Sequence, residues 1–149
     1  MLDLVTLAIE RALGVGARGA ARRAAVAGDV LEAGVWRGGT SIVAAATLAA
    51  HADAAQRERR VIVADSFRGI PSDSLVEWQQ RYDVARATVE DNFARHGLLR
   101  VTRPDGTASS HYVEGAPPVV FVEGFFNESL RRSARQTHCL LYTSPSPRD

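Results

Sequence analysis

The segment Gly28–Ser41, with the sequence GDVLEAGVWRGGTS, constrains the fold of this chain more than any other part. A short apolar run, Val30–Leu31, closes on the carboxylate of Glu32, and a glycine-rich turn follows before a long alanine-rich segment. Glycine permits a positive φ and lets a ligand approach where a Cβ atom would block it. The order of strand, turn and helix predicts a nucleotide- or cofactor-binding turn, with an ordinary strand–helix connection as the alternative.

The helix after this turn is expected to begin near Thr40. Thr40 or Ser41 can cap it, because a hydroxyl accepts a hydrogen bond from a free backbone N–H at a helix start. The helix start also presents oriented donors and the positive end of the helix dipole to an anionic group. The spacing Glu32-x-Gly34-x-x-x-Gly38 is therefore typical of a site that holds a nucleotide or a cofactor.

Composition narrows the classes of function. The chain has 149 residues, of which 46% are hydrophobic, enough for one domain with a core. A net charge of +1 argues against binding to nucleic acid or to an anionic membrane. All 18 basic residues are arginines, which excludes a lysine-dependent phosphate loop and Schiff-base chemistry. With Cys139 as its one cysteine, the chain has neither a disulfide framework nor a cysteine-rich zinc site.

Targeting signals are not apparent in the sequence. No apolar run approaches the ~20 residues of a membrane-spanning helix. The N-terminal segment carries Asp3 and no basic leader, unlike a secretory signal. We therefore expect a cytoplasmic protein with no membrane partner.

Two further apolar runs predict strands, and the first of them is of the buried type. Val61–Ala64 is followed by Asp65, and Val119–Glu123 leads to Gly124. Helical patterns cover four other segments: 2–13, Ala17–Ala27, Thr40–His51 and Asp83–His96. Strands that alternate with helices predict a parallel α/β sheet with right-handed crossovers.

The ends of the three predicted strands share one kind of feature. In an open parallel sheet the carboxyl ends of the strands lie together at one edge, where ligands bind. Asp65, which closes the second strand, is placed to accept two hydrogen bonds from ribose hydroxyls. Gly124 would let the backbone and Phe125 approach an adenine ring. Three strand ends in this order predict a site for an adenosine-bearing cofactor.

Four sequence blocks carry a resemblance to a known family: GDVLEAGVWRGGTS, VADSFRGIP, DNFARHGLL and FVEGFFNESL. From about Gly28 to Leu130, the chain resembles the macrocin O-methyltransferase (TylF/MycF) family. Members of that family are class I S-adenosylmethionine-dependent methyltransferases that act on sugar hydroxyls of natural products. The resemblance implies a Rossmann-like parallel sheet, S-adenosylmethionine as the cofactor and a glycosylated small molecule as the substrate.

The resemblance also implies roles for individual residues. The expected contacts are, for the methionine end of the cofactor, Glu32, Gly34 and Gly38; for the ribose, Asp65 with Ser66 and Phe67 beside it; and for the adenine, Gly124 and Phe125. Val35, Trp36, Thr40 and Ser41 complete the expected cofactor site, although Trp36 is more typical of a packing residue that shapes the turn. No residue is assigned a catalytic role, and none is assigned as a metal ligand.

The sequence departs from the family pattern after Leu130. Relatives continue with a fourth strand that bears an LDGD-like motif, which supplies magnesium ligands and, in related enzymes, the catalytic base. Here Arg131 and Arg132 follow and no such motif is present, so the magnesium expected for the family lacks its ligands. We expect a fold truncated at its C-terminal side, with one edge of the first strand left without a partner.

The last segment differs in composition from the rest of the chain. It ends in Pro-Ser repetition and has no helical or strand period. We expect residues 1–130 to form an incomplete S-adenosylmethionine-binding domain. Residues 131–149 are expected to be a disordered tail that is not native sequence.

Three functions are compatible with these patterns. The leading hypothesis is an S-adenosylmethionine-dependent O-methyltransferase that is inactive in this form. An NAD-dependent oxidoreductase fragment is the alternative, since the same sheet edge binds dinucleotides, although the turn lacks a closely spaced G-x-G. The third is a non-catalytic fragment that binds a nucleotide. A homo-oligomer stays open, and no nucleic-acid partner is expected.

Overall fold

The computed structural model describes residues 2–15, 24–51, 53, 56, 58–69, 82–99, 115–133 and 139–143. Its strands are β1 (Asp29–Ala33), β2 (Val61–Asp65), β3 (Val119–Glu123) and β4 (Cys139–Thr143). Its helices are α1 (Leu2–Ala12), α2 (Gly39–His51), α4 (Arg86–Arg95) and α5 (Phe126–Ser133). The strands form one parallel sheet in the order β3-β2-β1-β4, which confirms the predicted α/β class.

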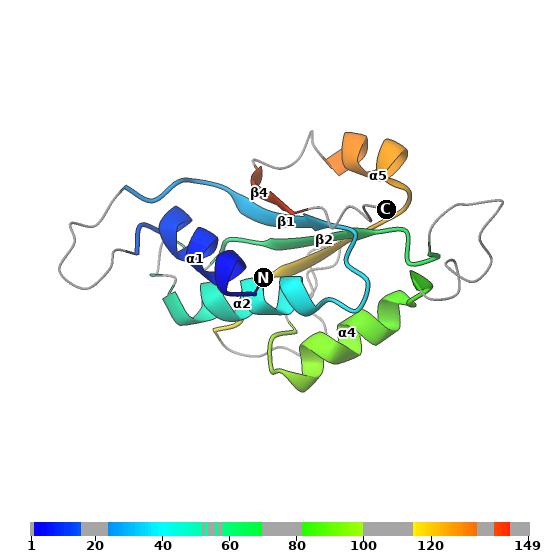
Figure 1. Cartoon of the computed structure of the whole chain (residues 1–149), viewed down its shortest axis with the longest axis horizontal. Helices are drawn as coiled ribbons and strands as arrows, with labels where there is room; N and C mark the ends of the chain where they lie inside the picture. The colour runs from blue at the N-terminus through cyan, green and yellow to red at the C-terminus, as the bar shows by residue number, and fades with distance from the viewer. Residues whose placement is uncertain are drawn as a thin grey trace.

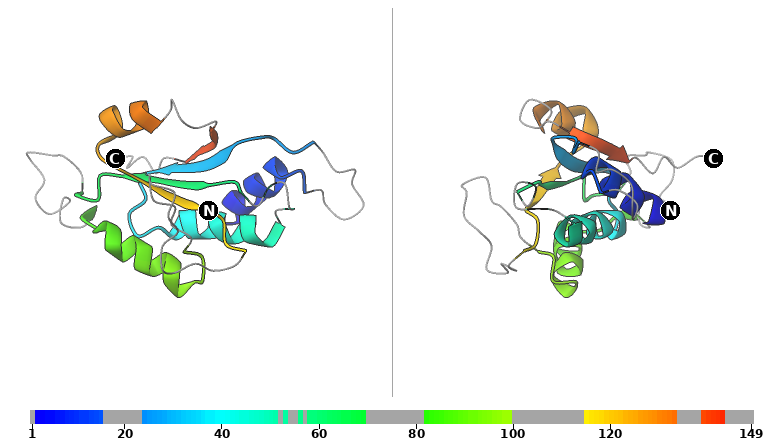
Figure 2. Two further views of the ribbon diagram at one scale, coloured as in Figure 1. Left: turned by 180° about the vertical axis from the view of Figure 1, so that it is seen from behind. Right: turned by 90° about the vertical axis from the view of Figure 1, so that its left-hand side faces the viewer.

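The helices are divided between the two faces of this sheet. Helices α2 and α4 lie on one face and α5 lies on the other (Figure 1). Helix α1 packs beside α2, and the view from behind shows the same arrangement (Figure 2). The turn between β1 and α2 therefore connects the sheet to the helices on one of its faces.

Alternation along the strands explains why both faces are covered. Val30, Val61 and Val63 belong to a large buried cluster that includes residues of α1, α2 and α4. Leu31 and Ile62 point the other way and form a smaller cluster, against which Leu130 of α5 packs. Successive side chains of a strand point to opposite faces, so an uninterrupted apolar run is buried on both sides.

Small residues allow α2 to approach the sheet closely. Ala44 and Ala45 are buried, and Leu48 fills the space behind them. On α1, Val5 and Ile9 contribute to the same core, as their helical spacing predicts. The hydrophobic effect thus secures α2 along β1 and β2, and so sets where its N-terminus lies.

Two predicted helices differ from the observed ones. Helix α4 begins at Arg86 rather than at Asp83, because the preceding Ala85 has an extended ψ of 143°. It ends before Gly97, whose φ of 66° confirms a glycine at the C-terminal end. In the segment predicted as Ala17–Ala27, residues 24–27 are not helical, and residues 17–23 lie outside the described part.

The C-terminal segment also differs from the expectation. Residues 131–133 belong to α5, and Cys139–Thr143 forms a strand, so helix and strand assignments extend beyond the predicted boundary at residue 130. Strand β4 pairs with β1, with Val30 opposite Leu141, so the predicted unpaired edge of β1 is wrong. Residues 139–142 are a short apolar run, as is typical of a parallel strand, but the Pro-Ser repetition that follows led to the prediction of an irregular segment. Residues 134–138 and 144–149 lie outside the described part.

Candidate functional site

The turn between β1 and α2 has an unusual backbone. Gly34 and Gly38 both have a φ of 84°, and Trp36 has a φ of 49°. A Cβ atom on Gly38 would lie 2.8 Å from Cγ1 of Val89, so this glycine lets α4 pack against the turn. Asn92 of α4 adds a hydrogen bond from Nδ2 to the carbonyl of Arg37 at 3.0 Å. Gly38 thus has a packing role in addition to its predicted cofactor role.

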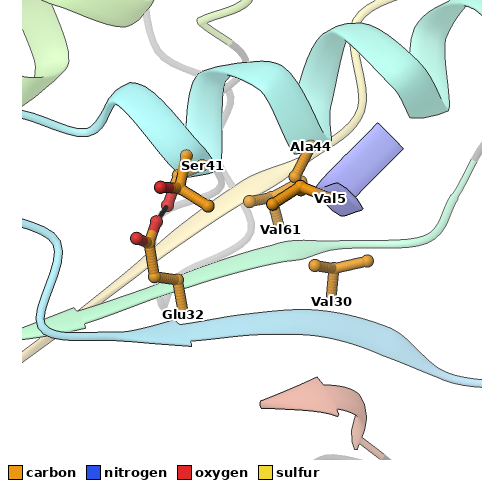
Figure 3. A pocket seen from close by; sticks show the side chains of 7 residues that line it. Val5, Val30, Glu32, Ser41, Ala44 and Val61 are labelled. Carbon is orange, nitrogen blue, oxygen red and sulfur yellow. Dashed lines mark hydrogen bonds between the residues drawn. The ribbon is translucent and has the colours of Figure 1, made fainter. Parts of the chain in front are cut away.

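The side chain of Glu32 turns toward α2 (Figure 3). Its Oε2 accepts a hydrogen bond from the hydroxyl of Ser41 in the first turn of the helix. Glu32 is only 5% exposed, and with Thr40 and Ser41 it forms the polar end of a small hollow otherwise lined by Val5, Val30, Ala44 and Val61. The carboxylate predicted to hold the methionine end of a cofactor is therefore bound to the start of α2.

Burial dominates the electrostatics of Glu32. Loss of hydration raises the pKa of its carboxyl above the ordinary value for glutamate. Hydrogen bonds from Ser41 and Thr40 favour the charged form but do not cancel this effect, and the nearby Asp65 adds repulsion that raises the pKa further. Glu32 is thus a buried acid that retains its proton more strongly than an exposed glutamate.

Asp65 joins two segments through its carboxylate. Oδ2 accepts hydrogen bonds from the backbone N–H groups of Val35 at 2.8 Å and Trp36 at 3.3 Å. Oδ1 accepts one from the backbone N–H of Phe67 at 2.9 Å, and the hydroxyl oxygen of Ser66 lies 3.5 Å from it. The residue predicted to bind ribose hydroxyls therefore also ties the β1–α2 turn to the loop after β2.

The loop after β2 is compact and partly buried. The Ser66 hydroxyl donates to the carbonyl of Gly69 at 2.9 Å and accepts from the N–H of Arg68 at 3.2 Å. Phe67 has a φ of 53°, and its ring lies in the core with its centroid 6.1 Å from that of Phe121. The Phe67 side chain is thus a packing group, and its backbone N–H is the part that contacts Asp65.

The end of β3 forms a third turn at the same edge. Gly124 has a φ of 133°, and a Cβ atom there would lie 3.3 Å from Cβ of Ser129. The buried hydroxyl of Ser129 lies 3.0 Å from the carbonyls of both Gly124 and Phe125, and it holds this turn against α5. The ring of Phe125 is left 40% exposed.

Backbone contacts bring these three turns together. The N–H of Gly34 donates to the carbonyl of Ala64 at 2.9 Å, and the N–H of Gly124 donates to the carbonyl of Asp65 at 3.0 Å. Of the twelve predicted site residues, the exposed ones are Trp36 and Phe125; the half-buried ones are Gly34, Thr40, Asp65 and Gly124; and the buried ones are Glu32, Val35, Gly38, Ser41, Ser66 and Phe67. The predicted grouping at one sheet edge is therefore observed, whereas individual ligand contacts stay predictions.

Three residues that support the site were not predicted: Val89, Asn92 and Ser129. They belong to α4 and α5, and each contacts a glycine turn from a distant part of the sequence. No local motif marks these residues, because their contacts depend on how the two helices dock.

Comparison with known proteins identifies the family. Residues 17–141 match the family model described as macrocin-O-methyltransferase (TylF). This chain belongs to the macrocin O-methyltransferase family. The match spans the glycine turn, the loop after β2 and the end of β3, so it covers all three parts of the candidate site.

Two curated relatives of this family have informative names. The 8-demethyl-8-(2,3-dimethoxy-alpha-L-rhamnosyl)-tetracenomycin-C 4'-O-methyltransferase of Streptomyces olivaceus is 47% identical over 50% of this chain and 31% of its own length. Mycinamicin III 3''-O-methyltransferase of Micromonospora griseorubida is 42% identical over 53% of this chain and 35% of its own length. The chain thus spans about a third of the length of these relatives.

A solved structure supports the same family. The O-methyltransferase NovP superposes with a TM-score of 0.60 and 28% sequence identity, over 87% of this chain and 46% of NovP. The agreement shows that this macrocin O-methyltransferase family member has the fold of an O-methyltransferase over most of its length.

The described residues lack two other features. Within them, no three or more His, Cys, Asp or Glu side chains are grouped so that they could hold a metal ion. Among the helices of that same part, none combines the length and apolar character needed to cross a membrane.

Proposed function

We propose that this chain forms the S-adenosylmethionine-binding part of an O-methyltransferase that methylates a hydroxyl of a glycosylated natural product. The observation that carries the proposal is the convergence of three turns, after β1, β2 and β3, at the carboxyl edge of a parallel sheet. Open α/β sheets bind their ligands at this edge. The names of the relatives, which include a rhamnosyl-bearing substrate, support the substrate class.

The residues at this edge fit the parts of such a cofactor. The start of α2, with the half-buried Thr40, offers the positive end of a helix dipole to a carboxylate. The exposed ring of Phe125, beside Gly124, offers an apolar surface for a flat adenine ring. Asp65 and Glu123, which are in register at the ends of β2 and β3, would provide negative charge near a cationic sulfonium.

In this proposal the chain contributes binding and orientation. A bound S-adenosylmethionine would supply an electrophilic methyl group for an acceptor oxygen. The three turns would hold the cofactor in one orientation. Holding two reactants in the right geometry lowers the barrier of a bimolecular reaction. The described residues do not fit a magnesium site, so the proposal includes no step at a metal.

Calorimetric titration of the purified chain with S-adenosylhomocysteine, NAD and adenosine tests the proposal. We expect S-adenosylhomocysteine to bind more tightly than adenosine, because it adds contacts at the start of α2. We expect no measurable binding of NAD. Tighter binding of NAD than of S-adenosylhomocysteine would overturn the proposal in favour of an oxidoreductase fragment.

A further inference from the structure

Two bulky residues of the candidate site have a backbone conformation that side chains rarely adopt. Among the described residues, the non-glycine residues with a positive φ are Trp36, at 49°, and Phe67, at 53°. Trp36 lies in the turn after β1, and Phe67 lies in the loop after β2. Such conformations are unfavourable for bulky side chains and persist only where surrounding contacts enforce them.

Both strained residues donate to the same carboxylate. The backbone N–H of Trp36 lies 3.3 Å from Oδ2 of Asp65, and the backbone N–H of Phe67 lies 2.9 Å from Oδ1. The N–H of Val35 shares Oδ2 at 2.8 Å. One side chain therefore satisfies three backbone donors from two segments that are about thirty residues apart in the sequence.

These contacts use most of the hydrogen-bonding capacity of Asp65. An ionised carboxylate offers about four acceptor positions. Three are taken by backbone N–H groups, whereas the Ser66 hydroxyl, 3.5 Å from Oδ1, directs its proton to the carbonyl of Gly69 at 2.9 Å. Hydrogen bonds from backbone N–H groups to a carboxylate are among the stronger ones in proteins, so ribose hydroxyls would compete with well-placed partners.

We infer that Asp65 is a positioning residue, which holds the turn after β1 and the loop after β2 in their strained conformations, and that ribose recognition is not its main role. The expected effect on cofactor affinity rests on the proposed function. Without the carboxylate, Trp36 would relax toward a negative φ, and the binding-competent form of the turn would be less populated. Apparent affinity falls in proportion to that population.

A pair of ligands separates positioning from ribose contact. The probes are S-adenosylhomocysteine and an analogue of it that lacks both ribose hydroxyls. We expect Asp65→Ala to weaken both by the same factor, about tenfold or more, because both need the ordered turn. A loss confined to the ligand that has its hydroxyls would overturn the inference and assign Asp65 to the ribose.

Substitutions at Trp36 provide a second test with a matched control. Trp36→Gly and Trp36→Ala both remove the ring, but only glycine adopts a positive φ without strain. In the Asp65→Ala background we expect Trp36→Gly to bind S-adenosylhomocysteine more tightly than Trp36→Ala. With Asp65 present the two should bind almost equally. Equal binding in both backgrounds would contradict the inference.

Stability measurements keep the inference testable even if no ligand binds. Urea unfolding, followed by circular dichroism, gives the unfolding midpoint of four variants. They are Trp36→Gly and Trp36→Ala, each with Asp65 present and each combined with Asp65→Ala. With Asp65 present, Trp36→Gly should unfold at higher urea than Trp36→Ala, because the enforced strain is relieved. With Asp65→Ala the difference should shrink. A strictly additive cycle would overturn the positioning role, whereas absence of ligand binding in the wild type would overturn only the proposed function.

Discussion

The Glu32 carboxylate on β1 accepts a hydrogen bond from the Ser41 hydroxyl on α2, and both side chains are almost fully buried. Strand alternation places Glu32 on the same face as Val30, directly beneath the start of the helix (Figure 3). This contact holds the end of the glycine turn that enters α2. Asp65, at the end of β2, holds the middle of the turn through the backbone N–H of Val35. The two acidic residues predicted as cofactor ligands thus also build the turn.

Glu32→Gln should change how stability depends on pH. Because the pKa of Glu32 is raised in the folded state, its contribution is largest at low pH. That contribution declines as pH rises from about 4.3, the ordinary value, through the folded-state pKa. The stability of Glu32→Gln relative to the wild type should therefore increase across this window and then level off.

Urea unfolding at a series of pH values measures this difference. Gly39→Ala, which changes no titratable group, should keep the wild-type pH profile. A stability difference between Glu32→Gln and the wild type that decreases as pH rises would contradict the raised pKa.

Ser41→Ala should destabilise the fold, because it removes a hydrogen-bond donor from a buried carboxylate. Leaving a buried polar group without its partner costs about 1–3 kcal/mol. The loss should be smaller in a Glu32→Gln background, where no buried charge remains. A chemical-denaturation cycle of the two single variants and the double variant measures this coupling, and an additive result would argue against the contact.

Gly38→Ala should be destabilising by about 1–3 kcal/mol, because a Cβ atom there would approach Cγ1 of Val89 to 2.8 Å at a positive φ. Gly39→Ala is the matched control, since nothing lies within 4 Å of a Cβ atom at that position. It should be neutral or stabilising, as alanine is favoured over glycine in a helix. Thermal unfolding of the two variants tests this contrast, and equal losses would show that α4 does not constrain the turn.

Phe125→Ala should weaken S-adenosylhomocysteine binding by about tenfold, the value of one aromatic ring stacked on a base. The unfolding midpoint should change little, because this ring is 40% exposed. Phe126→Ala is the matched control, as Phe126 is also 40% exposed but begins α5. Calorimetric titration separates the two, and an equal effect at both positions would remove Phe125 from the adenine site.

The sequence by itself determined β1, β2 and β3, the helix after the glycine turn and the sheet edge where the site lies. Val61–Asp65 and Val119–Glu123 are local apolar runs, which favour strands of a parallel sheet; β2 is buried, whereas β3, at the end of the strand order, is mostly half-buried. The positive φ values of Gly34 and Gly124 agree with the turns expected there. These features follow from local preferences, so the order of residues is sufficient to predict them.

Only the tertiary structure decided what the acidic residues contact. The backbone donors of Val35 and Trp36 are separated from Asp65 by about thirty residues, and the docking of β1 beside β2 creates their contact. The pairing of β4 with β1 likewise joins two segments that are far apart in the sequence. A carboxylate at a strand end can face a ligand, cap a helix or hold a loop, and the choice depends on which donors the packed chain brings within about 3 Å of it.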